Sequence, residues 1–281
     1  MPYANPQEEK LIAADRHQIF LRHWPVENPK AVVVICHGLG EHGGRYQNPL
    51  GRFLPAGYAA FAHDHRGHGR SDGRRGHVDR FDQFLDDTYQ VVVKAGETYP
   101  GKKIFVYGHS LGGLIALAYA LRHPDTIDGV ISSSPALKLS LEVPKAKATL
   151  GTLVSRIWPT LTLANEIDAN GLSHDATVVK EYLDDPLVHD KVSAKFFVEF
   201  QAAMARVLLG AGALRMPLLM THGSEDPLTS PAGSREFFDH AGSADKTYQL
   251  YEGQLHEVHN DTQKEQLLDL LVGWLDRHSA A

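Results

Sequence analysis

The sequence holds a single cysteine in 281 residues, Cys36, which excludes an intrachain disulfide. Because Cys36 ends the apolar run Val32–Cys36, we expect a buried thiol of the core and not a nucleophile. No stretch approaches the ~20 apolar residues of a membrane-spanning helix. The first ten residues show neither the basic nor the apolar region of a secretory signal. These absences predict a protein that is cytoplasmic or peripheral to a membrane.

Positive charge is also scarce, because 28 Lys and Arg stand against 34 Asp and Glu, for a net charge of −6. No basic stripe runs along any predicted helix, so we expect no nucleic-acid partner. The hydrophobic share of 43% and the charged share of 22% are ordinary for a globular protein. The length suits one large α/β domain or two small ones. The composition does not specify an oligomeric state.

Histidine, by contrast, is abundant, with 17 residues. Three of them lie in the cluster His63–His68, whose letters H-D-H-R-G-H resemble the H-x-H-x-D-H pattern of binuclear metallohydrolases. Gly67 stands where that pattern needs an aspartate, and the other histidines do not form helical i, i+4 pairs with a glutamate base. We therefore expect no metal and no cofactor, and we interpret the cluster as a polar loop that orders a neighbouring loop.

Apolar runs alternate with amphipathic stretches along most of the chain, which predicts an α/β fold with a mostly parallel sheet and helices on both faces. The expected strands are Glu9–Ala13, Gln18–Trp24, Ala31–Cys36, Tyr58–Ala62, Lys103–Tyr107, Gly129–Ser133, Pro217–His222 and Thr247–Tyr251. The first two should form an antiparallel start. The expected helices are Tyr46–Ala56, Phe81–Tyr99, Leu111–Arg122, Pro231–His240 and Asp261–His278.

The alternation breaks between Ala136 and Arg206, where the sequence offers no strand and several amphipathic helical patches. An insertion of this length between two strands is too long for a connecting loop. We therefore predict a helical cap, or lid, at 136–206 and an α/β core from 1–135 and 207–281. One helical face of the cap comprises Leu150, Leu153, Val154, Ile157 and Leu161, with Trp158 beside it. This face either packs on the body of the molecule or contacts apolar substrate, a membrane or a micelle.

The pentapeptide Gly108–Gly112, with the letters G-H-S-L-G, lies between a predicted buried strand and a predicted apolar helix. A strand, a sharp turn with serine at its apex and a helix form the context of a nucleophile elbow. Only glycines fit at the flanks of so tight a turn. Ser110 is therefore the candidate nucleophile, and the alternative is a glycine-rich turn with an incidental serine.

A serine hydroxyl needs an imidazole to take its proton and a carboxylate to hold that imidazole in the right tautomer. In the α/β-hydrolase order the acid and then the histidine follow the serine, each in a loop after a strand. Asp226 follows the strand Pro217–His222 and is the candidate acid, with Glu225 as the alternative. His256 follows the last strand and is the candidate base, while His259 is either a pocket residue or the cap of the final helix.

Acyl transfer also needs two backbone N–H donors aimed at the negative charge of the tetrahedral intermediate. Leu111, the residue after the nucleophile, is positioned to supply one of them. Leu39 fits the other, because it lies between glycines in the loop after the strand Ala31–Cys36. The donors are main-chain groups, so leucine at both positions is no objection.

Several sequence blocks together resemble the monoacylglycerol lipase family, and they span nearly the whole chain. The blocks are His37–His42, Gly44–Tyr46, Asp64–Ser71, Gly108–Gly113, Tyr182 with Asp185–Leu187, His222–Asp226 and Tyr251–Glu257. The H-G-x-G-E-H block and the D-P-L block of the cap narrow the resemblance beyond the general α/β-hydrolase fold. The rest of the cap matches poorly, which leaves the preferred chain length and head group open.

The resemblance implies a serine esterase of the α/β-hydrolase fold that cleaves monoacylglycerols, a lipid ester substrate, to fatty acid and glycerol. It also implies a mobile cap that forms an acyl tunnel, and no cofactor. In that family, polar residues near the nucleophile hold the glycerol end. The matching positions are Glu41, Arg45, His109, Tyr182 and His259. As the alternative, Glu41 and Arg45 simply pair to fix the oxyanion loop.

Other functions remain open at this point. A lysophospholipase or a broad-specificity carboxylesterase would share every catalytic residue and differ only in the pocket. An acyltransferase would pass the acyl group to an alcohol instead of water. A dehalogenase or an epoxide hydrolase would need an acid at position 110, where Ser110 stands. An inactive hydrolase-fold binding protein usually lacks a triad member, whereas all three candidates are present here.

Overall fold

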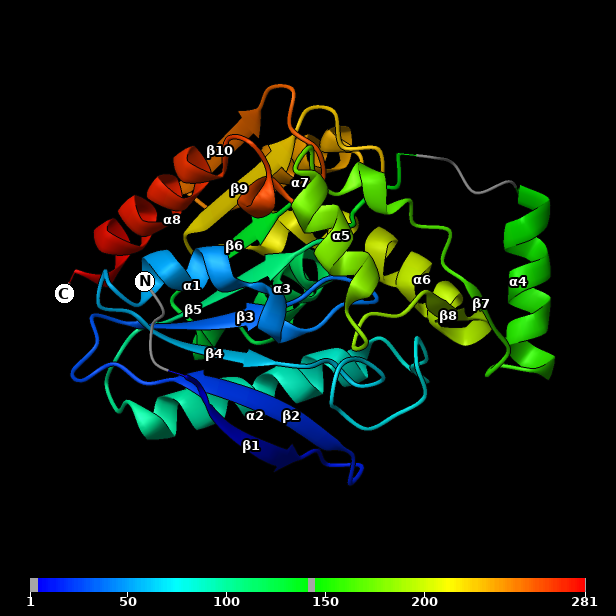
Figure 1. Cartoon of the computed structure of the whole chain (residues 1–281), viewed down its shortest axis with the longest axis horizontal. Helices are drawn as coiled ribbons and strands as arrows, with labels where there is room; N and C mark the ends of the chain where they lie inside the picture. The colour runs from blue at the N-terminus through cyan, green and yellow to red at the C-terminus, as the bar shows by residue number, and fades with distance from the viewer. Residues whose placement is uncertain (1–4, 141–144, 281) are drawn as a thin grey trace.

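Eight strands form one sheet in the order β1-β2-β4-β3-β5-β6-β9-β10 (Figure 1). The computed structural model describes residues 5–140 and 145–280, with backbone alone for residues 145–148. The strands are β1 (Gln7–Ile12), β2 (Gln18–Trp24), β3 (Val32–Cys36), β4 (Ala59–His63), β5 (Ile104–His109), β6 (Gly129–Ser133), β9 (Leu218–Gly223) and β10 (Lys246–Tyr251). β2 pairs antiparallel with β1 and β4, and every other pairing in this sheet is parallel. The predicted α/β sheet with an antiparallel start is therefore confirmed.

Helices cover both faces of this sheet because its central strands are apolar on both sides. In β3, Val32, Val34 and Cys36 belong to one core cluster, while Val33 and Ile35 belong to the other. The first cluster includes side chains of α2 (Asp82–Thr98), α3 (Leu111–Arg122), α6 (Ala194–Gly210) and α7 (Pro231–His240). The second includes side chains of α1 (Gln47–Phe53) and α8 (Lys264–Ser279). The Cys36 thiol is buried as predicted, and burial raises its pKa to about 12.

The predicted and observed bounds of these elements agree closely. Those of β2, β6, α3 and α7 are identical, and the others differ by at most three residues at an end. Short 3-10 helices complete the core at η1 (Gly43–Arg45), η2 (Pro124–Thr126), η4 (Ala211–Ala213) and η5 (Val258–Asn260). The largest shifts, of three residues, are at the end of α1 and at the start of α8, where η5 comes shortly before the regular helix begins.

The segment between β6 and β9 lies beyond the carboxyl ends of the parallel strands, at the right of Figure 1. It carries α4 (Lys145–Ile157), β7 (Thr162–Ala164), η3 (Ala169–Gly171), α5 (Ala176–Asp184), β8 (Lys191–Ser193) and then α6. The prediction that it has no strand was wrong, because β7 and β8 pair antiparallel with Thr162 opposite Ser193. Residues 141–144 of the predicted cap lie outside the described residues, and the predicted boundary at 206 falls inside α6.

The predicted apolar face of α4 is largely exposed. Leu150 is 59% exposed, Leu153 54%, Ile157 77% and the neighbouring Trp158 60%. The helix rests on α6 through another side, where Gly151 faces Phe197. For these four side chains, packing onto the body of the molecule is therefore the wrong interpretation.

One described segment, Ala194–Ala213, is long and apolar enough to cross a membrane by length and composition, so the expectation that no stretch reaches this length was wrong. Within α6, however, Phe196, Phe200, Ala203 and Val207 are buried in the core cluster beside α3. A core helix of a globular protein passes the same test.

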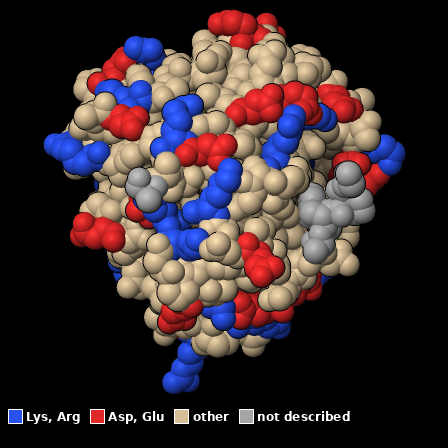
Figure 2. All heavy atoms as spheres, turned by 90° about the vertical axis from the view of Figure 1, so that its left-hand side faces the viewer, with Lys and Arg blue, Asp and Glu red and all other residues tan. Residues whose placement is uncertain are grey.

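On the face of the molecule that Figure 2 shows, basic and acidic side chains are interspersed.

Candidate active site

Ser110 occupies the turn between β5 and α3 in a backbone conformation that is rare for a residue with a side chain. Its φ is 56° and its ψ is −118°, and such strain persists only where surrounding contacts hold it. The Ser110 N–H donates to the carbonyl of Ser133 at 3.0 Å. A Cβ at Gly108 would collide with the Gly112 carbonyl, and one at Gly112 would collide with the Cys36 carbonyl. These are the features of a nucleophile elbow.

Asp226 and His256 lie side by side although 30 residues separate them in the sequence. The Nδ1–H of His256 donates to Oδ2 of Asp226 at 2.6 Å. The two loops meet because they follow β9 and β10, which are adjacent parallel strands. Glu225, the alternative acid, is exposed. Ser110 and His256 line the same small cavity, so the structure brings the predicted serine, acid and histidine to one place.

The Asp226–His256 pair is electrostatically matched. Burial raises the pKa of Asp226, but the His256 imidazole and a hydrogen bond from His222 together outweigh it and hold that pKa well below its ordinary value. Burial lowers the pKa of His256, but the Asp226 charge and hydrogen bond outweigh it, so this pKa is raised. The carboxylate therefore stays ionised and favours a proton on the imidazole.

Two more of the predicted residues, His109 and His259, surround His256. The His109 ring centre lies 4.6 Å from that of His256 and 4.8 Å from that of His259. The His259 ring stacks on Tyr46 at 5.2 Å. Burial lowers the pKa of His109 well below its ordinary value and that of His259 to about 4. Both imidazoles are therefore neutral near pH 7, as suits contact with an uncharged polar group.

Arg45 joins three parts of the site. Its Nη1 donates to Oε2 of Glu41 at 2.5 Å and to Oε1 of Glu257 at 2.7 Å, while Nη2 donates to Oε2 of Glu257 at 3.1 Å. Its guanidinium carbon lies 4.8 Å from the ring centre of Tyr182 in α5. Glu41 also accepts from the Gly38 N–H at 2.6 Å. The pairing of Glu41 with Arg45 is thus present, and Glu257 is a residue that the sequence interpretation missed.

The two residues predicted to donate to the oxyanion lie close to Ser110. Leu39 lines the cavity that contains Ser110, and Leu111 is the first residue of α3. The N–H groups of a helix's first turn have no intrahelical acceptor, so they are available to a ligand. The hydrogen bond from Gly38 to Glu41 holds the loop that carries Leu39.

The cavity at Ser110 has a volume of about 20 Å³, little more than a single water molecule requires. It is lined by Gly38, Leu39, Glu41, His109, Ser110, Ile167, Leu172, Tyr182, Leu228, His256 and Glu257. Ile167, Leu172 and Tyr182 come from the predicted cap and close it. Of the predicted head-group residues, Glu41, His109 and Tyr182 border this cavity, whereas Arg45 and His259 stand behind its wall.

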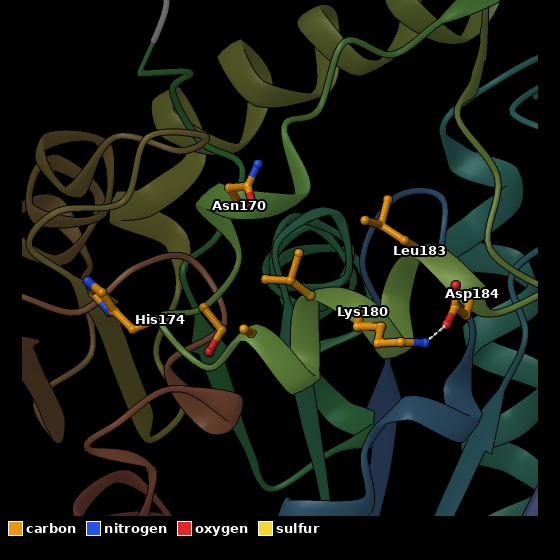
Figure 3. A pocket seen from close by; sticks show the side chains of 8 residues that line it. Asn170, His174, Lys180, Leu183 and Asp184 are labelled. Atoms are coloured by element: carbon orange, nitrogen blue, oxygen red, sulfur yellow. Dashed lines mark hydrogen bonds and ion pairs between the residues drawn. The ribbon is translucent and has the colours of Figure 1, made fainter.

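A larger hollow of about 310 Å³ lies on the other side of α5 (Figure 3). Asn170, His174 and Leu183 line it, and Lys180 pairs with Asp184 at its edge. None of the predicted site residues is among the described side chains that line it. α5 therefore separates this outer hollow from the cavity at Ser110, to which it contributes Tyr182.

The histidine cluster His63–His68 packs against the loop after β3. The His65 N–H donates to Nε2 of His37 at 2.8 Å, and the His65 ring bonds to the His37 carbonyl at 3.1 Å. Burial lowers the pKa of His63 to about 4 and that of His68 to about 3. Among the described residues, no group of three or more His, Cys, Asp or Glu is placed to hold a metal ion. The cluster orders the loop that carries Leu39.

Comparison with known proteins identifies the family. The profile of the family described as "Serine aminopeptidase, S33" matches residues 27–263. An uncharacterized abhydrolase domain-containing protein of Dictyostelium discoideum is 38% identical over 94% of this chain, which spans only 28% of that relative's length. A monoacylglycerol lipase of Mycolicibacterium smegmatis is 36% identical over 90% of this chain and 91% of its own. The crystal structure of Paleococcus ferrophilus monoacylglycerol lipase superposes with a TM-score of 0.86 at 36% identity, covering 92% of this chain and 99% of that one.

The mostly parallel sheet and the strand–serine–helix turn define the class of α/β-hydrolase-fold proteins. The chain belongs to the serine hydrolase family described as "Serine aminopeptidase, S33", together with the monoacylglycerol lipases that it resembles over most of their length. It is a carboxylic ester hydrolase.

Proposed function

We propose that this protein hydrolyses monoacylglycerols to fatty acid and glycerol through Ser110, His256 and Asp226. His256 takes the Ser110 proton through Nε2 as the serine oxygen attacks the ester carbonyl. The tetrahedral intermediate collapses, the alcohol leaves with the proton from His256, and the acyl group stays on Ser110. Water then attacks this acyl-enzyme, giving its proton to His256, and releases the fatty acid and the free serine.

The observation that carries this proposal is the 2.6 Å bond from His256 Nδ1 to Asp226 beside the strained Ser110 turn. Because Asp226 accepts the proton of Nδ1, the lone pair of the neutral imidazole is on Nε2, the nitrogen that must act as base. Ser110 and His256 share the cavity in which an ester would react.

The other site residues take supporting roles in this proposal. The main-chain N–H groups of Leu39 and Leu111 bind the oxyanion. Glu41, His109 and Tyr182, which border the cavity, contact the alcohol part of the substrate. Arg45 and His259 lie behind them and hold them in place.

The test is fatty-acid release from mono-, di- and triacylglycerol of one chain length and from lysophosphatidylcholine, with Ser110→Ala as the blank. We expect a strong preference for the monoacylglycerol and no turnover by the variant. Comparable rates on the lysophospholipid, or good activity on short esters alone, would replace this substrate with that of a lysophospholipase or a general esterase. Turnover by Ser110→Ala at the wild-type rate would refute the nucleophile.

Residues 136–206 act in this proposal as a lid. The cavity at Ser110 is small and is lined by Ile167, Leu172 and Tyr182 of this segment, so in the proposal the segment moves to let an acyl chain enter. Leu150, Leu153, Ile157 and Trp158 then provide an exposed apolar face for a membrane or micelle that holds the substrate. The protein would work in the cytoplasm, peripheral to that surface.

Co-sedimentation with phosphatidylcholine vesicles tests the lid surface. We expect the Leu153→Ser/Ile157→Ser variant to pellet less than the wild type, because two exposed apolar side chains are lost. Ile12→Ser is the matched control, since Ile12 is 61% exposed but lies on β1, away from α4 (Figure 1). Equal pelleting of all three proteins would remove the membrane contact from the proposal.

A further inference from the structure

His222 is a buried histidine that the mechanism above does not use. It lies in β9 near its carboxyl end, and its side chain has no exposed surface. Its Nδ1 is 2.7 Å from Oγ of Ser234 in α7. Its Nε2 lies 3.1 Å from Oδ2 of Asp226 and 3.0 Å from the Thr229 carbonyl. The Thr229 hydroxyl is also 3.3 Å from Nε2. Because the nearer Thr229 carbonyl and the Asp226 carboxylate can only accept hydrogen bonds, we assign the proton to Nε2, and Nδ1 accepts from the Ser234 hydroxyl.

The carboxylate of Asp226 is saturated by donors. Oδ2 receives the Nε2–H of His222, the Thr229 hydroxyl at 2.8 Å and the Nδ1–H of His256 at 2.6 Å. Oδ1 receives the main-chain N–H groups of Leu228 and Thr229 at 2.8 and 2.9 Å. The Thr229 hydroxyl has one proton and also lies 3.1 Å from the Ser134 carbonyl, so the four N–H groups are the constant donors. They match the roughly four lone-pair sites of a carboxylate and restrict its rotation.

We propose that His222 is a positioning residue that acts through Asp226 on the catalytic histidine. It holds Oδ2 where His256 Nδ1 needs it, and it withdraws negative charge from that oxygen. This inference rests on the proposed function, because it assumes that His256 is the base. Ser234 belongs to the same hydrogen-bond network, because its hydroxyl donates to Nδ1 of His222 and so keeps the His222 proton on Nε2.

Loss of the His222 donor has two consequences. Oδ2 becomes a stronger acceptor toward His256, which raises the basicity of the imidazole and moves the acid limb of the kcat/KM profile to higher pH. The freed carboxylate also turns more easily, so His256 spends less time aimed at Ser110, and kcat falls while KM stays. The titratable groups that face His256 are Asp226 after β9, His109 at the end of β5, His259 in η5, and Glu41 and Glu257.

The experiment compares His222→Leu with His222→Gln on a monoacylglycerol. A charge-assisted hydrogen bond predicts that His222→Leu lowers kcat about 10-fold with KM unchanged. His222→Gln keeps an N–H donor of similar reach and should recover most of the rate. His23→Leu is the matched control, because His23 is also buried and hydrogen-bonded, to Tyr99 in another part of the molecule, so its kcat should stay at the wild-type value.

The Asp226→Asn background separates positioning from a general structural effect. If His222 acts through Asp226, His222→Leu should cost less than 2-fold more in that background, because the carboxylate that it serves is gone. An equal loss in both backgrounds, or an unshifted acid limb together with no rescue by His222→Gln, would overturn the inference.

Two measurements keep the test decisive. Ser234→Ala removes one oxygen atom and leaves the His222 ring intact, so this variant should fold even if His222→Leu unfolds. It should shift the pH profile in the same direction as His222→Leu. The NMR resonance of the His256 Nδ1 proton should move in the His222 variants without any turnover, and an unmoved resonance would also overturn the inference. Failure of the wild type to release fatty acid would refute the proposed function instead.

Discussion

At the scale of single residues, the elbow depends on the space around Gly112. A Cβ there would collide with the main-chain carbonyls of Cys36 and His37, which belong to β3 and to the loop that carries Leu39. We expect Gly112→Ala to lower the thermal midpoint and to abolish ester hydrolysis, because the start of α3, with Ser110, must move away from the loop that carries Leu39. Differential scanning fluorimetry and an ester assay would measure both effects.

The control for Gly112 is Gly96, a glycine inside α2. A Cβ at Gly96 would meet only the Cδ1 atom of Ile104 at 3.7 Å, an ordinary contact. Alanine is preferred to glycine within helices by about 0.5–1 kcal/mol, so Gly96→Ala should stabilise the protein slightly and leave activity intact. If both substitutions destabilised the protein equally, the collision at Gly112 would not be the cause.

Single residues also show which parts of the candidate site the sequence predicts and which it does not. Ser110, Asp226 and His256 could be predicted because each follows a predicted strand, and parallel strands end at one edge of a sheet. His222 and Glu257 could not, because a histidine in a strand and an acid beside a base fit many roles. What defines them is a partner elsewhere in the chain, such as Arg45, which is 212 positions from Glu257.

At the scale of elements, the ion pairs of Arg45 connect η1 with two loops, the one after β3 that carries Glu41 and the one after β10 that carries Glu257. Burial raises the pKa of Glu257, but Arg45 outweighs this and holds the pKa far below its ordinary value. Arg45→Met would leave Glu41 and Glu257 buried without a counter-charge. We expect a loss of about 3–5 kcal/mol in the free energy of unfolding, measured by urea titration at pH 7.

The matched control for Arg45 is Arg52, which pairs on the surface with Glu265 and Asp269. Its side chain is 40% exposed, compared with 10% for Arg45. Exposed pairs contribute about 1 kcal/mol at most, so Arg52→Met should change stability little. If the two substitutions lowered the free energy of unfolding equally, the buried ion pairs of Arg45 would contribute no more to stability than surface pairs do.

The elements differ in how well the sequence predicts them. β3, β5 and β6 are buried along their whole length, and the apolar residues that they share predict buried parallel strands. β7 and β8 have three residues each and form a sheet of their own, so their pairing depends on where the cap folds back and not on a local pattern. The exposed face of α4 could not be predicted either, because the amphipathic spacing of a helix does not show whether its apolar side is buried or exposed.

At the scale of the whole molecule, buried histidines make stability depend on pH. Burial lowers the pKa of His63 to about 4 and that of His68 to about 3, and it places those of His37 and His65 well below the ordinary value. In the unfolded chain these groups titrate near about 6.5. Below that pH the unfolded chain binds more protons than the folded chain, so the free energy of unfolding falls as the pH falls.

The expected slope is about 1.4 kcal/mol per pH unit for each such histidine between about pH 6 and pH 4.5. Above about pH 7.5 these groups are neutral in both states and contribute no slope. Carboxylates with lowered pKa values, such as Glu257 and Asp226, also make the free energy of unfolding fall on acidification. They do so only near and below about pH 4.3, where the carboxyl groups of the unfolded chain take up protons. The window therefore isolates the histidines, and urea titrations within it should show a steep loss of stability on acidification.

His63 is the best histidine to remove, because neither of its buried ring nitrogens has a hydrogen-bond partner among the described residues. His63→Leu deletes one titrating group without breaking a hydrogen bond, so the slope should fall by about 1 kcal/mol per pH unit, below the full value because His63 with a pKa of about 4 binds some protons near pH 4.5. If His63→Leu kept the wild-type slope, the folded protein would have to protonate His63 as readily as the unfolded chain does, and the histidine cluster would then not be a neutral part of the core that supports the loop of Leu39.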